Sequence, residues 1–454
     1  MTTNQIGARE IVLDMLLEVI EGDKYSHTVL SQTLRANQDL DKQERAFISR
    51  LFQGTVKSYL KLDYIIGQFS NVPIKKMKPL IRNLLRLSVY QLLSMDQVPA
   101  SAVCNEAVKI AKKRGFTGLS GFVNGVLRNT SRKLDQVKYP DKHKDPAFYF
   151  EVMYSVPNWL AKELLKQYDF TTVEAIFTAS LKEKELTIRC NKNKITPEQL
   201  KQELAAEGIT VEQSEFLDYA FKIKDYDYLE KLETFQKGKF AVQDVSSMLV
   251  CQVAGIKETD FVVDICAAPG GKALHAAELA RKVSARDLTL YKTKLIDDNI
   301  KRMGFGNIDT KVWDATILDE SIICQADVVI CDLPCSGLGV FGKKSDLKYK
   351  LNQNQFKELI ELQRVILKIA QSYVRENGVL IFSTCTINRE ENQDNRDWIM
   401  KNLKLQPESL DEYLPDKLCS ESTKDGYLQL IPGIHETDGF FISKFRKTGN
   451  HMEL

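Results

Sequence analysis

Several common signatures of function are missing from this 454-residue chain. It has no run of about eighteen apolar residues that could span a bilayer, and its first residues lack the basic-then-apolar order of a signal peptide. No C-x-x-C pair occurs and the five histidines are scattered, which argues against a zinc site. No G-x-x-x-x-G-K-[ST] phosphate loop is present. We therefore expect a cytoplasmic protein with no membrane partner and no metal.

Composition and cysteine usage favour a reduced, multidomain globular protein. Apolar residues make up 43% of the chain and charged residues 27%, as in ordinary soluble domains. The length exceeds that of one typical domain. The nine cysteines follow no regular spacing, which indicates free thiols rather than a disulfide framework.

Positive charge is concentrated at the front of the chain. Residues 1–140 hold 21 Lys and Arg against 12 Asp and Glu, whereas the remainder holds 42 against 49. The basic side chains between 75 and 133 are opposed only by Asp96 and Glu106; they are Lys75, Lys76, Lys78, Arg82, Arg86, Lys109, Lys112, Lys113, Arg114, Arg128, Arg132 and Lys133. Such a stretch suits contacts with a phosphate backbone, although a solvated helix face would have the same composition.

Hydrophobic periodicity predicts three domains. Residues 1–135 repeat apolar side chains at steps of three and four and are expected to be all-helical. A polar, proline-containing linker is expected over 134–150. Residues 145–232 mix two helices, one at about 158–166 and one capped by Thr196, with short strands and predict a small α+β domain. Residues 237–447 alternate strands and helices.

The alternation in the last domain predicts a parallel sheet covered on both faces. Its short apolar strands are expected at 261–263, 283–285, 327–330 and 379–382, separated by helical segments. The fold class is therefore α/β. Ligands of such sheets bind beyond the carboxyl ends of the strands, near the point where the strand order reverses.

A glycine turn and three acids fall at these strand ends. The turn follows the first strand and reads Cys266-Ala267-Ala268-Pro269-Gly270-Gly271-Lys272, and Asp287, Asp314 and Asp332 follow later strands. Each acid alone could be a turn or cap residue, but together they predict a nucleoside site, with a ribose contact at Asp287 and an adenine contact at Asp314. The turn lacks the G-x-G-x-x-G order of nicotinamide folds, so S-adenosyl-L-methionine fits better.

Two thiols occupy similar positions fifty residues apart. Asp332-Leu333-Pro334-Cys335-Ser336-Gly337 and Ser383-Thr384-Cys385-Thr386 each follow an apolar strand. Cytosine C5 is a weak nucleophile, and covalent addition of a thiolate to C6 activates it. A methyltransferase that attacks a pyrimidine covalently needs such a thiol. The other cysteines are interpreted as packing residues.

These motifs resemble the RNA cytosine-C5 methyltransferases. The front domain, with Gln43-Glu44-Arg45-Ala46-Phe47 and Asn124-Gly125-Val126-Leu127-Arg128, resembles the antitermination factor NusB and points to the RsmB (Sun) family. Gln243-Asp244-Val245-Ser246-Ser247-Met248 and Asp438-Gly439-Phe440-Phe441 extend the resemblance over most of the chain.

The resemblance implies a Rossmann-like class I methyltransferase domain at 237–447, a NusB-like RNA-binding domain at 1–135 and an RRM-like domain at 145–232. It implies methylation of cytosine 967 in 16S rRNA, free or in early assembly, by a monomer with no DNA partner. Carried over by residue, Cys385 is the nucleophile, Cys335 assists proton removal and product release, and Asp332 contacts base N3. The turn 266–272 and the three acids would bind the cofactor.

Two departures from the family pattern affect this carry-over. Only fourteen residues separate Lys272 from Asp287, so residues 280–282 must form a tight turn before the second strand. Phe341-Gly342-Lys343-Lys344 stands where relatives tend to carry arginines, which offers phosphate a less bidentate contact.

Three other functions compete with this interpretation. They are cytosine-C5 methylation of tRNA or of another rRNA site, non-catalytic binding by an RNA assembly factor, and adenine-N6 methylation. The last fits least, because such enzymes stack the flipped base on an aromatic residue after Asp/Asn-Pro-Pro, and this chain has Asp332-Leu333-Pro334-Cys335.

Overall fold

A computed structural model describes residues 7–182 and 185–448 and divides the chain into two compact units. The helical unit comprises residues 1–182 and 341–350, and the sheet unit comprises 183–340 and 351–454. The predicted first domain begins at residue 1, and residues 1–6 lie outside the described part. No helix within the described ranges is long and apolar enough to cross a membrane.

The helical unit is built around the apolar stripes that its sequence predicts. Val12, Leu13 and Leu16 of the first helix pack with Leu84 and Leu85 of the fourth in one buried core. Its helices are α1 (Ala8–Leu16), α2 (Ser26–Ala36), α3 (Lys42–Phe69), α4 (Pro79–Ser94), α5 (Ala100–Lys113), α6 (Ser120–Arg132), α7 (Pro146–Tyr154), α8 (Asn158–Gln167), α9 (Phe170–Leu181) and α15 (Leu347–Lys350), with short turns η1 (Leu17–Glu21), η2 (Ile74–Lys76), η3 (Thr117–Leu119) and η4 (Leu134–Gln136).

The connection after α6 is shorter than the predicted linker. Residues 137–145 have no regular structure, and Pro146 then occupies the first turn of α7, where its missing N–H costs no hydrogen bond. Helices α7 to α9 belong to the helical unit, and the described residues from 185 onward, except 341–350, belong to the sheet unit. The segment predicted as a middle domain, 145–232, is thus divided between the two units.

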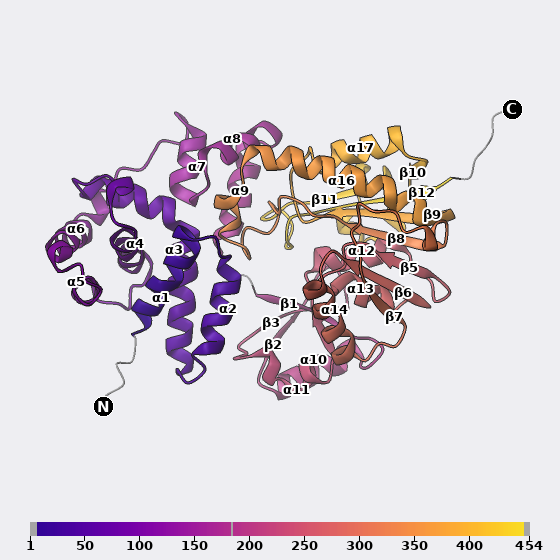
Figure 1. Cartoon of the computed structure of the whole chain (residues 1–454), viewed down its shortest axis with the longest axis horizontal. Helices are drawn as coiled ribbons and strands as arrows, with labels where there is room; N and C mark the ends of the chain where they lie inside the picture. The colour runs from indigo at the N-terminus through magenta and orange to yellow at the C-terminus, as the bar shows by residue number, and fades with distance from the viewer. Residues whose placement is uncertain (1–6, 183–184, 449–454) are drawn as a thin grey trace. The chain divides into compact units, whose positions relative to one another are not determined.

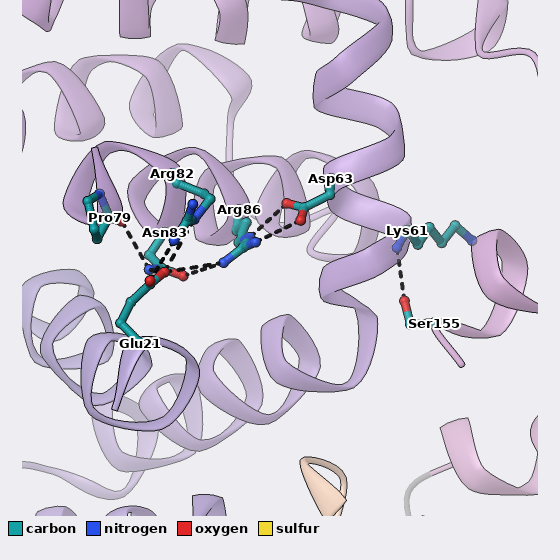
Figure 2. A network of polar contacts seen from close by, with 8 residues as sticks. All are labelled: Glu21, Lys61, Asp63, Pro79, Arg82, Asn83, Arg86 and Ser155. Carbon is teal, nitrogen blue, oxygen red and sulfur yellow. Dashed lines mark hydrogen bonds and ion pairs between the residues drawn. The ribbon is translucent and has the colours of Figure 1, made fainter. Parts of the chain in front are cut away.

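A polar network joins η1, α3 and α4 inside the helical unit (Figure 2). Arg86 donates from Nε and Nη2 to the two carboxylate oxygens of Asp63, both at 2.7 Å. Asn83 Nδ2 donates to Glu21 Oε1 at 2.8 Å, and Arg82 pairs with the same carboxylate. Because the Arg86 side chain is 5% exposed, its bidentate partner compensates a buried charge.

This pairing divides the basic stretch into two groups. Five of its twelve cations form ion pairs within the unit: Arg82, Arg86, Lys109, Lys113 and Arg114. The other seven are exposed and have no ion pair within the described residues: Lys75, Lys76, Lys78, Lys112, Arg128, Arg132 and Lys133. The second group, the unpaired cations, carries the charge that an anionic partner could meet.

Residues 341–350 follow the Cys335 segment in sequence but pack into the helical unit. The buried Lys348 ammonium donates to the carbonyl oxygens of Lys57, at 3.2 Å, and Tyr154, at 3.1 Å. Tyr154 is the last residue of α7, where carbonyls lack partners within the helix and attract a cation. Asp346 accepts the Ser26 N–H at 3.0 Å. Burial lowers the pKa of Lys348 to about 7.

Removing the Lys348 amine should change how stability depends on pH. Because the folded-state pKa lies below the unfolded value, this group costs stability below about pH 7, and the cost disappears as pH rises toward the unfolded pKa. Above pH 7 this group should make the free energy of unfolding of the wild type rise by at most about 1.4 kcal/mol per pH unit, and Lys348→Met should lack that rise. Urea unfolding at pH 7, 8 and 9 measures it, with Lys350→Met, a more exposed ammonium, as the control. Equal slopes in wild type and Lys348→Met would contradict the assignment.

The sheet unit begins with a four-stranded antiparallel sheet in the order β2-β3-β1-β4. Thr196 caps α10 as predicted, in a capping box with Gln199, and Pro197 is the first helical residue. The elements are β1 (Leu186–Cys190), α10 (Pro197–Ala206), β2 (Thr210–Gln213), β3 (Ala220–Lys224), η5 (Leu229–Lys231), α11 (Glu233–Gln236) and β4 (Phe240–Val242).

An eight-stranded sheet follows and confirms the predicted α/β class (Figure 1). Its main order is β10-β12-β9-β8-β5-β6-β7, with β11 paired to β12; β7, β6, β5, β8 and β9 are parallel and β12 is antiparallel. The elements are α12 (Val245–Ala254), β5 (Phe261–Asp264), α13 (Gly271–Ala277), β6 (Lys282–Asp287), α14 (Leu290–Met303), β7 (Ile308–Val312), η6 (Glu320–Ile322), β8 (Ala326–Asp332), α16 (Gln353–Tyr373), β9 (Val374–Thr384), α17 (Gln393–Asn402), β10 (Leu405–Pro407), η7 (Asp411–Tyr413), η8 (Asp416–Leu418), α18 (Glu421–Lys424), β11 (Tyr427–Leu430) and β12 (Phe440–Lys447).

Both faces of the parallel strands are buried, which explains their continuous apolar runs. Val262 of β5 packs on the face covered by α12, α13 and α14, whereas its neighbour Val263 packs on the face covered by α16 and α17. The chain moves outward from β5 through β6 to β7 and then returns to β8 on the other side of β5. The strand order therefore reverses between β5 and β8, where this fold binds ligands.

Candidate active site

The predicted glycine turn lies at the carboxyl end of β5 and leads into α13. Gly270 has φ of 109°, a conformation that other residues rarely adopt. A Cβ atom there would also lie 3.3 Å from Ile296 Cγ2 of α14. The turn is fixed to β6, because the Ala267 N–H donates to the Arg286 carbonyl at 2.8 Å and the Ala268 N–H donates to Asp287 Oδ2 at 2.9 Å.

Asp287 ends β6 and lies directly beside this turn despite the short connection before it. The N–H groups of Arg281 and Lys282 both donate to the Asp260 carbonyl, at 3.1 and 3.2 Å, so the chain reverses tightly and β6 begins at once. The buried Asp287 carboxylate also pairs with Lys292 Nζ at 2.9 Å. The connection is thus shorter than the family pattern, but Asp287 still lies beside the glycine turn.

Asp314 follows β7 by two residues rather than ending it. Its Oδ1 accepts from the Thr316 N–H at 2.8 Å and the Thr316 hydroxyl at 2.6 Å. The hydroxyl, followed by the N–H, lowers the pKa of Asp314. The preceding Trp313 N–H donates to the Asp287 carbonyl at 2.9 Å, which joins the ends of β6 and β7. Asp314 is thus a charged turn residue beside the end of β6.

A buried ionic cluster lies between the glycine turn and β8. Lys272 Nζ pairs with Asp332 Oδ2 at 2.6 Å, and the Ser383 hydroxyl donates to Asp332 Oδ1 at 2.9 Å. Burial opposes the charge on Lys272, but Asp332 and then Asp264 raise its pKa above the ordinary value. Burial raises the pKa of Asp264 to about 7, against the charge of Lys272 and a backbone hydrogen bond from Cys266, which both favour the ionised carboxylate.

The two predicted thiols meet at the ends of β8 and β9. Cys335 Sγ and Cys385 Sγ lie 3.3 Å apart, both are partly exposed, and all nine cysteines are free. The contact with Cys385 and then burial raise the pKa of Cys335. Neighbouring strand ends bring the sulfurs together, because the Leu333 N–H donates to the Ser383 carbonyl at 3.0 Å.

Two glycines allow backbone segments to stack beside the thiols. The Gly339 N–H donates to the Cys385 carbonyl at 3.0 Å, and the Gly439 N–H donates to the Gly339 carbonyl at 2.9 Å. A Cβ atom on Gly339 would lie 1.9 Å from Gly439 O, so no larger residue fits without moving a backbone. The sequence singled out the segment around Gly439 without assigning it this role.

Sequence reasoning missed Glu391, a fully buried carboxylate near the thiols. It contacts Ser336, which follows Cys335, and lies six residues after Cys385. The motif Asn388-Arg389-Glu390-Glu391-Asn392 is polar throughout and gives no local sign that one of its acids is internal. Phe440 was quoted only as part of a family motif, without a role; Lys272 Nζ lies 5.1 Å from its ring centroid, within cation–π range.

The remaining cysteines divide by burial. Cys104, Cys190, Cys251 and Cys331 are buried, as expected of packing residues. Cys266 and Cys419 are partly exposed, and Cys324 is exposed, so the packing interpretation is wrong for Cys324. Cys266 lies in the glycine turn itself, where burial and then Asp264 and Asp287 raise its pKa.

A parallel sheet whose order reverses beside a glycine turn, with acids at or just after neighbouring strand ends, is the architecture of a Rossmann-like nucleoside-binding domain. Residues 252–446 match the family described as 16S rRNA methyltransferase RsmB/F, residues 7–132 match the NusB family, and residues 156–227 match the ferredoxin-like domain of the RsmF/B methyltransferases.

Full-length relatives agree with these matches. The chain is 37% identical to the probable ribosomal RNA small subunit methyltransferase B of Bacillus subtilis, over 98% of this chain and 99% of that protein. It is 30% identical to the probable ribosomal RNA small subunit methyltransferase B of Synechocystis, over 97% of this chain and 100% of that protein. The chain belongs to the RsmB/F family of rRNA methyltransferases.

Solved structures share the fold. The crystal structure of PH0851 covers 98% of this chain and 99% of its own, with a TM-score of 0.80 and 25% identity. NSun6 from Pyrococcus horikoshii covers 69% of this chain and 99% of its own, with a TM-score of 0.57 and 22% identity.

Proposed function

We propose that this enzyme transfers a methyl group from S-adenosyl-L-methionine to C5 of one cytosine in 16S rRNA, position 967 by family resemblance, through a covalent bond between Cys385 and C6. The observation that carries the proposal is the 3.3 Å approach of two free thiols beside Asp332 at adjacent strand ends. A pyrimidine seated there meets a nucleophile and a second sulfur together.

The residues at the glycine turn fit a nucleoside cofactor. The turn 266–272 would bind it, and Gly270 provides a backbone surface without side-chain bulk. Asp287 and Asp314 are acceptors for ribose hydroxyls and the adenine edge. Asp264, buried at the carboxyl end of β5, lies where a carboxylate could meet a polar or cationic part of the ligand. When bound, S-adenosyl-L-methionine supplies an electrophilic methyl group.

Cys385 and Asp332 prepare the base in the proposed reaction. The Cys385 thiolate adds to C6 and breaks the C5–C6 double bond, so electron density moves to C5 and makes it nucleophilic. Asp332, the ion-pair partner of Lys272, would contact N3 of the cytosine and favour protonation of the ring there. The ion pair with Lys272 fixes the orientation of that carboxylate before the base arrives.

Cys335 completes the reaction. After C5 carries the new methyl group, its original proton must leave, and the electrons of that C–H bond re-form the double bond while the Cys385–C6 bond breaks. The 3.3 Å distance between Cys335 Sγ and Cys385 Sγ supports Cys335 as the acceptor of that proton. The products are the methylated cytosine and a free Cys385 thiolate.

The unpaired cations of the helical unit are the proposed contact for the rRNA backbone. Each phosphate that they neutralise releases condensed counterions, so binding should weaken as salt rises. We propose a monomer that recognises 16S rRNA free or in early assembly, with no DNA partner. A cytoplasmic location follows from this substrate.

The proposal is tested by mapping 5-methylcytosine with bisulfite sequencing after incubation with S-adenosyl-L-methionine. Protein-free 16S rRNA, assembled small subunits and bulk tRNA are compared. The expected result is methylation of one cytosine in free 16S rRNA and little in assembled subunits. Methylation of tRNA alone, or of no RNA in any form, would contradict the proposal; the second outcome would favour a non-catalytic assembly factor.

A further inference from the structure

Glu391 links the segments that carry the two thiols through a chain of hydrogen bonds. Its Oε2 accepts the Ser336 N–H at 2.9 Å and Gln363 Nε2 at 3.1 Å. Its Oε1 accepts the Ser336 hydroxyl and Asn388 Nδ2, the latter at 3.2 Å. The Ser336 hydroxyl in turn contacts Thr386 Oγ1 at 2.8 Å. One carboxylate thus binds the residue after Cys335 and, through it, the residue after Cys385.

The neighbours of Glu391 match an ionised carboxylate. Burial raises its pKa, but all four contacts bring donors toward its oxygens. A neutral acid would have to place its own proton among those donors. The ionised form accepts all four contacts, so these donors favour a charged Glu391 against the burial that raises its pKa.

The charges around the two sulfurs are asymmetric. Glu391 lies on the side of Cys335 and, after Cys385 and burial, adds to the causes that raise the pKa of Cys335. Lys272 is close enough to Cys385 that negative charge on that sulfur, after Asp332 and Asp264, helps to raise the pKa of the ammonium. Like charge beside one sulfur and opposite charge beside the other give the two thiols different protonation states.

We propose that Glu391 is a positioning residue that holds the Cys335 segment against Cys385 and keeps Cys335 in the thiol form, so that Cys385 is the sulfur that ionises. This inference deepens the proposed function and, for its catalytic meaning, rests on it. Two features of the site carry it: the contact chain from Glu391 through Ser336 to Thr386, and the 3.3 Å approach of Cys335 Sγ to Cys385 Sγ beside that chain.

The arrangement also sets an order of events. While Cys385 is a thiolate, its charge and its hydrogen bond hold the proton on Cys335. Once Cys385 is bonded to C6 it carries no charge, so Cys335 can release its proton to water and become a thiolate. That thiolate then takes the proton from C5 and returns to the thiol form. The device thus prevents the second sulfur from becoming a base before the first has reacted.

The test uses the full chain without RNA or cofactor, so it is independent of the methylation assay. The protein is treated briefly with iodoacetamide between pH 6 and 9, and peptide mass spectrometry measures alkylation at each cysteine. In wild type, Cys385 should be alkylated before Cys335. In Glu391→Gln the ratio of Cys335 to Cys385 alkylation should rise about tenfold, the change that one pKa unit produces.

Two control variants separate charge from folding. Asp319→Asn neutralises another buried carboxylate of the same unit, paired with Lys311 and Arg286, and should leave the ratio unchanged. Ser336→Ala removes the hydroxyl link but keeps the Glu391 charge, so Cys385 should still react first.

An unchanged ratio in folded Glu391→Gln would overturn the proposal. So would wild-type protein that alkylates Cys335 first, an outcome that needs no variant to fold. If Cys385 reacts first and the ratio shifts as expected but no RNA is methylated, the proposed function fails while the assignment of the ionised sulfur stands.

Discussion

Cys385→Ala should lose both methyl transfer and the covalent RNA complex, whereas Cys335→Ala should lose turnover but accumulate a covalent RNA complex. The first variant has no sulfur to add to C6, and its rate should fall by about 10⁴-fold or more, as for loss of a nucleophile that acts as part of a unit. The second still forms the bond but cannot remove the C5 proton, so the adduct persists. Denaturing gels with labelled 16S rRNA and initial-rate assays measure the two effects.

The control for this pair is Cys324→Ala. Cys324 is an exposed thiol of the same unit, so its removal should leave both rate and adduct at wild-type levels. In the double variant Cys335→Ala with Cys385→Ala, the adduct of the single Cys335 variant should disappear. A denaturation-resistant complex in Cys385→Ala would contradict the assignment of the nucleophile.

Asp332→Asn should also cause a large loss, through a different step. The amide cannot form the 2.6 Å ion pair with Lys272, whose ammonium is then left buried without its closest counter-charge. Breaking one partner of a buried pair costs about 3–5 kcal/mol. The oriented carboxylate proposed to contact N3 is lost as well, so kcat/KM should fall by about 10²–10⁴-fold.

The adduct distinguishes this loss from that of Cys335. Asp332→Asn acts before or during addition to C6, so little covalent complex should accumulate. Ser383→Ala is the matched control, since it removes only the 2.9 Å hydrogen bond to Asp332 and should cost about 0.5–1.5 kcal/mol. Turnover by Asp332→Asn within about threefold of the wild-type rate would contradict this role. Even a tenfold loss would correspond to only about 1.4 kcal/mol.

The sequence predicts the sheet well where burial determines the pattern. The predicted strand at 261–263 corresponds to β5, and that at 327–330 lies inside β8. Strands buried on both faces leave continuous apolar runs that do not depend on distant contacts. The Thr196 cap is equally local, because its partner Gln199 is three residues away.

Contacts between distant residues could not be predicted in this way. The pairing of Gly339 with Gly439 joins segments a hundred residues apart, and an isolated glycine does not name its partner. Lys348 belongs to the predicted methyltransferase domain, 237–447, by sequence. In the structure, however, residues 341–350 belong to the helical unit. Burial of Glu391 depends on donors from Ser336 and Gln363, which only the folded chain assembles.

The count of basic residues between 75 and 133 was limited in a similar way, because composition does not reveal which cations have acidic partners. Arg82 and Arg86 belong to the basic stretch, but their partners Glu21 and Asp63 lie outside it in sequence. The connection between Lys272 and Asp287 is visibly short in the sequence. In the structure the Ala268 N–H still donates a hydrogen bond to Asp287, so the short connection does not displace this acid.

The most direct measurement identifies the sulfur bonded to the base. An rRNA substrate with 5-fluorocytosine at the target position cannot lose a proton from C5, so the adduct should be trapped after methylation. Protease digestion and mass spectrometry of the crosslinked peptide then locate the modified cysteine. The nucleotide is expected on Cys385. Attachment to Cys335, with Cys385 unmodified, would contradict the assignment of Cys385 as the nucleophile.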